Sequence, residues 1–201
     1  MPLFEMSDAK FNYIDQGAGL PLVFQHGLGG DVHQSESFLV RGVRFLSFDA
    51  RGHGQTTGSL DRLSFSSFAD DLCSLLKYLE INAAVIGGIS MGAGVALNFA
   101  LRFPNETLAL ILCRPAWLNE PLPKNLLLFP YIAKLIEHEG SVRGRRLFEA
   151  SDLFQEIRSR SVDSANSNDV RQSGISQYWT KCQRTFLTKI RQTGKPSLFP
   201  H

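Results

Sequence analysis

The feature that most constrains this chain is a glycine-framed serine between a strand pattern and a helix pattern. Residues 83–89 are small and apolar, which favours a buried strand. The motif Gly-Ile-Ser-Met-Gly follows over residues 88–92, and helical spacing then continues to Phe103. A Gly-x-Ser-x-Gly turn between a strand and a helix is the context of a nucleophile elbow centred on Ser90. The alternative is a small-residue turn such as a nucleotide-binding loop, but no phosphate-loop lysine follows.

Further apolar runs on both sides of this motif indicate the fold class. A helix with one apolar face is expected over residues 66–79, between the strands. Strands that alternate with helices in this order predict an α/β fold, with a mostly parallel sheet and helices on both faces. The expected strands are an edge strand at 9–15 and buried strands at 21–25, 43–48, 83–89 and 107–113.

The pattern changes after residue 118, where prolines interrupt the apolar runs and longer helical spacing begins. We therefore predict a core domain over residues 1–118 and a helical cap over 119–191, with the start of a further core strand at 192–201. Within the cap, helices are expected over 129–138, 144–160 and 173–191, and a polar loop over 161–168.

Charge and cysteine content exclude several classes of function. The 21 basic and 19 acidic residues give a net charge of +2, which argues against a nucleic-acid binder of the basic-patch kind. No apolar run approaches the roughly 20 residues of a membrane helix, and the first ten residues do not resemble a signal peptide. Cys73, Cys113 and Cys182 have no disulfide or zinc spacing. We therefore expect a cytoplasmic protein without metal, membrane or nucleic-acid partners.

A second glycine-rich loop, His-Gly-Leu-Gly-Gly over residues 26–30, ends another predicted parallel strand. The carboxyl ends of parallel strands meet at one edge of a sheet, so this loop is expected beside Ser90. Backbone N–H groups in such a loop can approach a substrate oxygen, and the N–H groups of Leu28 and Met91 are predicted to form an oxyanion hole. A plain turn is the alternative. His26 is expected to be a structural hydrogen-bonding residue.

A third loop, Asp-Ala-Arg-Gly-His-Gly over residues 49–54, follows the strand at 43–48. Charged and glycine residues in this density favour a turn fixed by local side-chain to backbone hydrogen bonds. We therefore predict a structural role for Asp49 and His53 and not a catalytic one.

With these three loops in this order, the chain resembles the α/β-hydrolase superfamily, and within it the small esterase, enol-lactonase and carbon–carbon bond hydrolase group. The resemblance implies that Ser90 is the nucleophile, that Leu28 and Met91 supply the oxyanion N–H groups, and that no cofactor is used. It also implies a small ester, lactone or related carbonyl substrate in an apolar pocket under the cap. Candidate lining residues are Trp117, Leu126, Phe129 and Tyr131, for which ordinary cap packing is the alternative.

The chain departs from this family pattern in its catalytic acid and base. In the family an Asp or Glu and then a His follow on later strands, and this sequence holds no counterpart of either. Glu120 is the candidate substitute for the acid, and a solvated loop residue is the alternative for it. His33 is the candidate substitute for the base, and a surface histidine is the alternative; His138 and His201 suit the role of the base less well. Two hypotheses remain: a serine hydrolase, or a truncated, catalytically impaired relic or binding module of the same fold. Slow turnover and an exposed sheet edge are expected.

Overall fold

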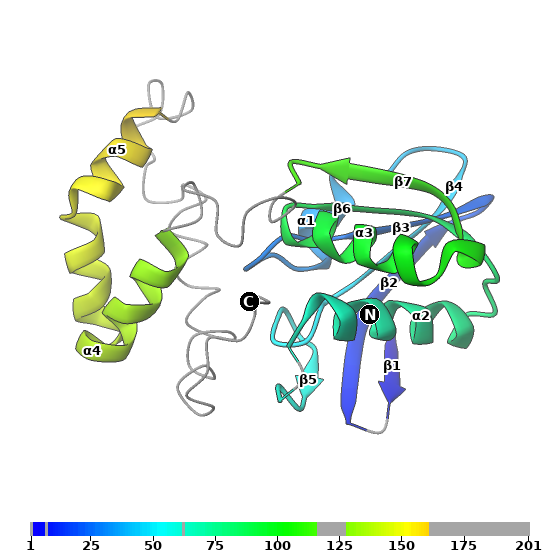
Figure 1. The fold of residues 1–201 in the computed structure, drawn as a ribbon, viewed down its shortest axis with the longest axis horizontal. Coiled ribbons are helices and arrows are strands. Elements are labelled where there is room, and N and C mark those ends of the chain that lie inside the picture. The colour runs from blue at the N-terminus through cyan, green and yellow to red at the C-terminus, as the bar shows by residue number, and fades with distance from the viewer. Residues whose placement is uncertain (1, 7, 62, 116–127, 161–201) are drawn as a thin grey trace. The chain divides into compact units, whose positions relative to one another are not determined.

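The computed structural model of this chain describes residues 2–6, 8–61, 63–115 and 128–160 (Figure 1). Contacts divide these residues into two units, one that takes in the described residues up to 115 and one that takes in residues 128–160. The expected loop at 161–168, the helix at 173–191 and the strand at 192–201 lie outside the described residues.

The first unit is built on a mixed, mostly parallel sheet whose strand order is β1-β2-β4-β3-β6-β7, with β5 paired to β2. The first two pairings, β1 with β2 and β2 with β4, are antiparallel, and the next three are parallel. The predicted α/β fold class is therefore confirmed. The strands are β1 (Leu3–Met6), β2 (Ala9–Gly17), β3 (Leu20–Gln25), β4 (Val43–Phe48), β5 (Thr57–Gly58), β6 (Ala84–Ile89) and β7 (Thr107–Cys113).

The prediction that residues 9–15 form an edge strand is wrong. The strand β2 lies between β1 and β4, so both of its edges are paired. The four-residue strand β1 was not predicted, because it is too short to show a period of two. It is held by Phe4, which is buried and stacks on Phe11 of β2 with ring centroids 5.7 Å apart.

Helices cover both faces of this sheet. The helices α2 (Phe65–Tyr78) and α3 (Met91–Arg102) pack on one face, where Leu72, Leu75 and Phe99 join the main hydrophobic core. The short helix α1 (Val32–Glu36) lies on the other face, over the smaller cluster around Phe24 and Phe45. The Ser64 hydroxyl caps α2 by accepting the Ser67 N–H at 3.0 Å. A 3₁₀ turn, η1 (Pro104–Glu106), leads into β7.

Within the described residues, β7 pairs with β6 alone and forms one border of the sheet (Figure 1). Its apolar side chains are unusually exposed for a strand of a parallel sheet: Leu108 is 55% exposed, and Leu110 and Ile111 are 37% and 39% exposed. The border formed by β7 is thus unpaired among the described residues, and the exposed edge expected of the whole chain stays a prediction.

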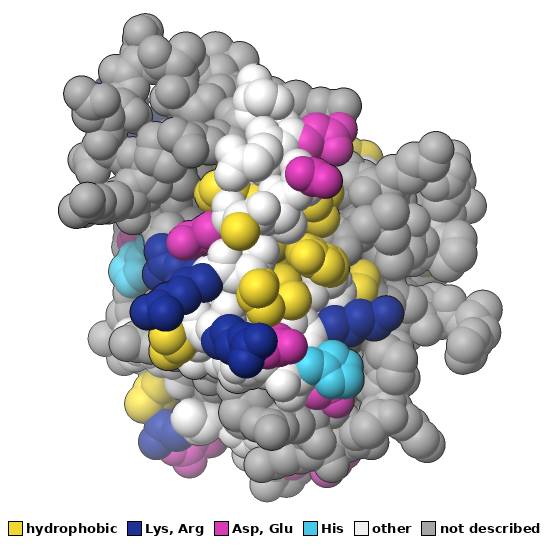
Figure 2. Space-filling view, turned by 90° about the vertical axis from the view of Figure 1, so that its left-hand side faces the viewer, with side chains coloured by type: hydrophobic (Ala, Val, Ile, Leu, Met, Phe, Trp, Pro, Cys, Tyr) yellow, Lys and Arg dark blue, Asp and Glu magenta, His cyan; other side chains and the backbone are white. Residues whose placement is uncertain are grey.

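The second unit consists of α4 (Leu128–Glu149) and α5 (Asp152–Arg160). Gly140, at φ 74° and ψ 170°, breaks α4 into two helical halves that pack around Ile132 and Phe148. Figure 2 shows basic, acidic and apolar side chains mixed on the coloured part of the surface that faces the viewer. The predicted helix at 129–138 is confirmed, while the one at 144–160 is the end of α4 followed by α5. No described helix has the length and apolarity to cross a membrane.

Candidate active site

Ser90 lies in a one-residue turn between β6, which ends at Ile89, and α3, which begins at Met91. Its backbone has φ 55° and ψ −111°, a conformation that costs an L-residue roughly 1–3 kcal/mol. The turn is held by the Ser90 N–H, which donates to the Cys113 carbonyl of β7 at 3.0 Å. The predicted strand-to-helix turn at Ser90 is therefore present, and it is strained.

The two motif glycines allow the strand and the helix to approach closely. A Cβ atom at Gly88 would collide with the Gly92 carbonyl group. A Cβ atom at Gly92 would collide with the backbone carbonyls of Gln25 and His26, at the end of β3. The glycines thus let α3 start against the ends of the neighbouring strands β3 and β6. The N-terminus of α3 and Ser90 therefore both lie at the carboxyl ends of these strands.

The Ser90 side chain projects from this turn without a local partner. Its hydroxyl does not cap α3 and bonds to no other described residue. The carbonyl oxygen of Ser90 accepts the N–H groups of Ala93 and Gly94, at 3.0 and 3.3 Å, so the backbone is bound while the hydroxyl is left available. The side chain is half-buried.

The loop over residues 26–30 lies against this serine, as the sequence predicts. The strands β3 and β6 pair in parallel up to Gln25 opposite Gly88. A Cβ atom at Gly27 would stand 3.5 Å from the Ser90 Cβ. Neither the Leu28 nor the Met91 N–H bonds to another described residue, so both donors remain available for a substrate oxygen. Their joint action as an oxyanion hole stays a prediction.

His26 is fully buried and uses both ring nitrogens in structural hydrogen bonds. The Ala50 N–H donates to its Nε2 at 3.0 Å, so that nitrogen carries no proton. The proton then lies on Nδ1, which donates to the Gly27 carbonyl at 2.8 Å. The ring therefore ties the Ser90-facing loop to the loop after β4, and the predicted structural role of His26 is confirmed.

Asp49, at the end of β4, binds three separate segments through its buried carboxylate. One oxygen accepts the Val32 N–H at 2.8 Å, and the other accepts the Asn12 side-chain amide at 2.9 Å and the Gln55 N–H at 2.8 Å. The predicted turn held by side-chain to backbone hydrogen bonds is confirmed, since the Gln55 contact closes it. The contacts to Asn12 and Val32 join it to β2 and to α1.

His53 is buried in the same loop and is unsuited to act as a base. Burial, together with the neighbouring His26 ring at a centroid distance of 5.0 Å, lowers the pKa of His53 to about 3. Its Nδ1 donates to the Arg51 carbonyl at 3.0 Å. His53 is therefore a neutral packing element of the loop at ordinary pH.

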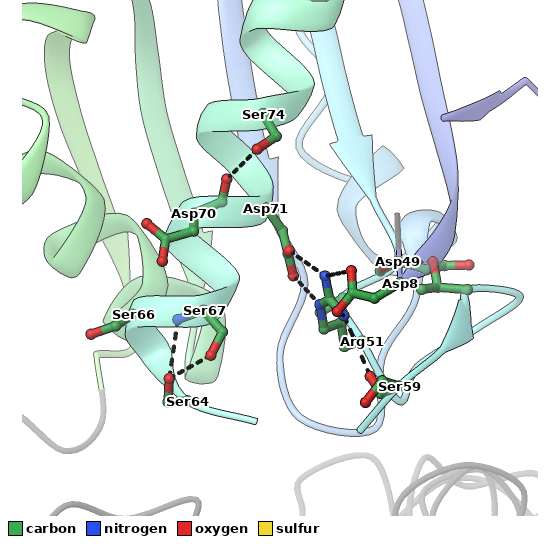
Figure 3. A network of polar contacts seen from close by, with 12 residues as sticks. Asp8, Asp49, Arg51, Ser59, Ser64, Ser66, Ser67, Asp70, Asp71 and Ser74 are labelled. Carbon is green, nitrogen blue, oxygen red and sulfur yellow. Dashed lines mark hydrogen bonds and ion pairs between the residues drawn. The ribbon is translucent and has the colours of Figure 1, made fainter. Parts of the chain in front are cut away.

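Arg51 anchors the same loop on the side of α2 (Figure 3). The buried guanidinium binds Asp71 of α2 with two bonds, at 2.8 and 2.9 Å, and Asp8 in the turn after β1 with two more, at 2.7 and 2.9 Å. Burial disfavours the charged guanidinium, but these carboxylates outweigh that cost and raise the pKa of Arg51. These partners could not be predicted from the sequence, because Asp8 lies 43 residues and Asp71 lies 20 residues from Arg51.

Of the two candidate substitutes for the acid and base, only His33 lies within the described residues. His33 is exposed on α1, and its Nδ1 lies 2.8 Å from Glu36, a hydrogen bond that raises the pKa of His33. No hydrogen bond joins it to Ser90. Glu120, Trp117, Leu126 and His201 lie outside the described residues. Phe129 and Tyr131 are in α4, where Tyr131 packs near Phe148 with ring centroids 6.3 Å apart.

No described part of the chain gathers three His, Cys, Asp or Glu side chains that could hold a metal ion. The groups that the structure brings together at the site are the Ser90 hydroxyl, the loop over residues 26–30 and the N-terminus of α3.

Residues 21–140 match the family described as alpha/beta hydrolase fold. A non-heme chloroperoxidase, CPO-A1, from Kitasatospora aureofaciens is 39% identical over 107 residues, which are 51% of this chain and 39% of that protein. A bifunctional esterase/perhydrolase, DCH, from Acinetobacter calcoaceticus is 34% identical over 92 residues, 44% of this chain and 33% of that protein. The chain spans less than half the length of the curated relatives it matches.

Among solved structures, the fold is similar to that of Est816, described as an N-acyl homoserine lactone degrading enzyme. The TM-score is 0.67 at 20% sequence identity, and the match covers 98% of this chain and 73% of that one. At this identity the likeness shows the fold alone.

Proposed function

Because this chain belongs to the α/β-hydrolase family, we propose that Ser90 is the nucleophile in the hydrolysis of a small ester, lactone or related carbonyl compound. The observation that carries the proposal is the strained turn that projects the Ser90 hydroxyl at the N-terminus of α3, next to the loop over residues 26–30. The name of a curated relative, an esterase/perhydrolase, supports this substrate class.

The described residues fit the first step of acyl transfer. The Ser90 Oγ adds to the carbonyl carbon and gives up its proton to a base, while the carbonyl π pair moves onto oxygen. That oxyanion accepts the N–H groups of Leu28 and Met91, and each donor of this kind is worth roughly 3 kcal/mol in the transition state. Collapse expels the alkoxide, which takes up a proton, and water then cleaves the acyl-serine by the same steps.

The base is the part that the described core does not provide. His26 has both nitrogens in structural bonds, His53 is buried and neutral, and His33 bonds to Glu36. This observation favours a second candidate function, a catalytically impaired binding module of the same fold. Without general-base help a serine is a weak nucleophile near neutral pH, so we propose slow turnover by these residues alone.

Hydrolysis assays distinguish the two candidates. Release of p-nitrophenol from p-nitrophenyl acetate and butyrate, and ring opening of an N-acyl homoserine lactone, are measured for the chain and for Ser90→Ala. Turnover that Ser90→Ala abolishes supports the hydrolase. No Ser90-dependent turnover, with a folded protein by circular dichroism, supports the binding module.

A further inference from the structure

We propose that Gln34 is a positioning residue of the site, whose side-chain carbonyl holds the loop over residues 26–30 in the conformation that presents the Leu28 N–H. The proposal deepens the proposed function and rests on it, since it assigns the partner that shapes the oxyanion loop. Gln34 lies in α1, outside every motif in the sequence.

The direct contact is between Gln34 and the first glycine of the loop. The Gly27 N–H donates to the Gln34 Oε1 at 2.8 Å. Gly27 is also the residue whose Cβ position lies 3.5 Å from the Ser90 Cβ. Gln34 therefore binds the loop at the point where it passes the serine.

The neighbouring N–H groups of the loop are directed elsewhere. The Gly30 N–H donates to the Gly27 carbonyl at 2.9 Å, and the Val32 N–H donates to Asp49 at 2.8 Å. The Leu28 N–H bonds to no described residue, although Leu28 itself is buried. A backbone N–H donor that has no partner among the described residues is suited to a substrate oxygen.

Gly30 shows that the loop is shaped around Gln34. A Cβ atom at this position would collide with the Gln34 Oε1 and come within 3.0 Å of the Gly27 carbonyl oxygen, so the Gln34 side chain would have to shift. Gly30 is not among the residues with positive φ, so a larger residue here would meet the Gln34 side chain and not an unfavourable backbone angle. The loop over residues 26–30 and the Gln34 side chain therefore pack closely against each other.

Two substitutions separate the acceptor from the shape of the side chain. Gln34→Met keeps the length and removes the acceptor, whereas Gln34→Glu keeps an oxygen that can accept the Gly27 N–H. Gln16→Met is the matched control, because Gln16 contacts the same helix only through an exposed 3.4 Å bond to Glu36. The readouts are hydrogen exchange of the Gly27 amide by NMR and the rate at which a fluorophosphonate modifies Ser90.

We expect Gln34→Met to speed Gly27 exchange and to slow Ser90 modification about tenfold, because a misplaced oxyanion donor loses most of its effect. Gln34→Glu restores both readouts, and Gln16→Met changes neither. If the wild type is modified at Ser90 but Gln34→Met shows an unchanged modification rate or unchanged Gly27 exchange, the positioning role of Gln34 is overturned and the proposed function stands. A wild type that is not modified at Ser90 at all overturns the proposed function and the positioning role with it.

Discussion

At the scale of single residues, the backbone conformation of Ser90 sets this turn apart from an ordinary strand-to-helix turn. A serine at φ 55° and ψ −111° is strained, and the strain persists because Gly88, Gly92 and the bond to Cys113 fix the turn. Stored strain of this kind aims a side chain at the cost of stability.

This strain predicts that Ser90→Gly is more stable than Ser90→Ala. Both changes remove the hydroxyl, so their difference isolates the backbone, and we expect glycine to gain about 1 kcal/mol after its entropy cost in the unfolded chain. Urea unfolding of the two variants measures the difference. An alanine variant as stable as the glycine variant would show that the turn is relaxed.

Arg51 is the residue whose loss should cost the most outside the hydrophobic core. The Arg51 side chain is 3% exposed and pairs with the equally buried Asp71, so its removal takes the guanidinium partner away from a buried carboxylate. We expect Arg51→Met to lower the free energy of unfolding by about 3–5 kcal/mol. Arg102→Met is the control, since Arg102 and Asp70 form an exposed pair worth about 0–1 kcal/mol. Equal losses in both variants would contradict the account.

At the scale of elements, the site depends on how closely the start of α3 approaches the end of β3. Gly92 makes this possible, because its Cα faces the carbonyls of Gln25 and His26. Helix propensity and packing make opposite predictions at this position.

We expect Gly92→Ala to destabilise the protein by about 1–3 kcal/mol, because the added methyl pushes α3 away from β3. Propensity alone predicts the opposite, a gain of about 1 kcal/mol for alanine inside a helix. The sign of the change in unfolding free energy therefore decides between them. A stabilised variant would mean that α3 and β3 are further apart than the structure shows.

The elements around Ser90 could be predicted from the sequence because their signals are local. The strand β7 and the junction of β6 with α3 follow from apolar runs and helical spacing, with bounds that agree to within one residue at most ends. The helix α1 has only five residues, too few to show a period, and it was missed. The roles of Gln34, Asp8 and Asp71 could not be predicted, since each depends on a contact between segments that only the fold brings together.

At the scale of the whole molecule, the buried His53 links folding to pH. The pKa of His53 is about 3 in the folded protein, because of burial first and then His26, and 6.5 is its ordinary value. The unfolded chain thus binds the additional proton between these values. The contribution of neutral His53 is fully present above the ordinary pKa and is lost as pH falls toward the folded one.

We therefore expect stability to decline below about pH 6.5, with His53 contributing up to about 1.4 kcal/mol per pH unit. In His53→Asn this part of the slope disappears, whereas His138→Asn, a change at an exposed histidine of α4, leaves it as it is. Urea unfolding of the three proteins at several pH values between about 4 and 8 measures the slopes. Parallel slopes in the wild type and His53→Asn would show that His53 is accessible to protons.

Covalent modification decides whether Ser90 is the reactive nucleophile. The chain is incubated with excess fluorophosphonate, and the modified peptide is identified by mass spectrometry beside Ser90→Ala and Ser74→Ala. Ser74 is the control, because its hydroxyl donates to the Asp70 carbonyl within α2. We predict one adduct, on Ser90, that disappears in Ser90→Ala and persists in Ser74→Ala. No adduct on the wild-type chain, or one that remains in Ser90→Ala, would contradict the account.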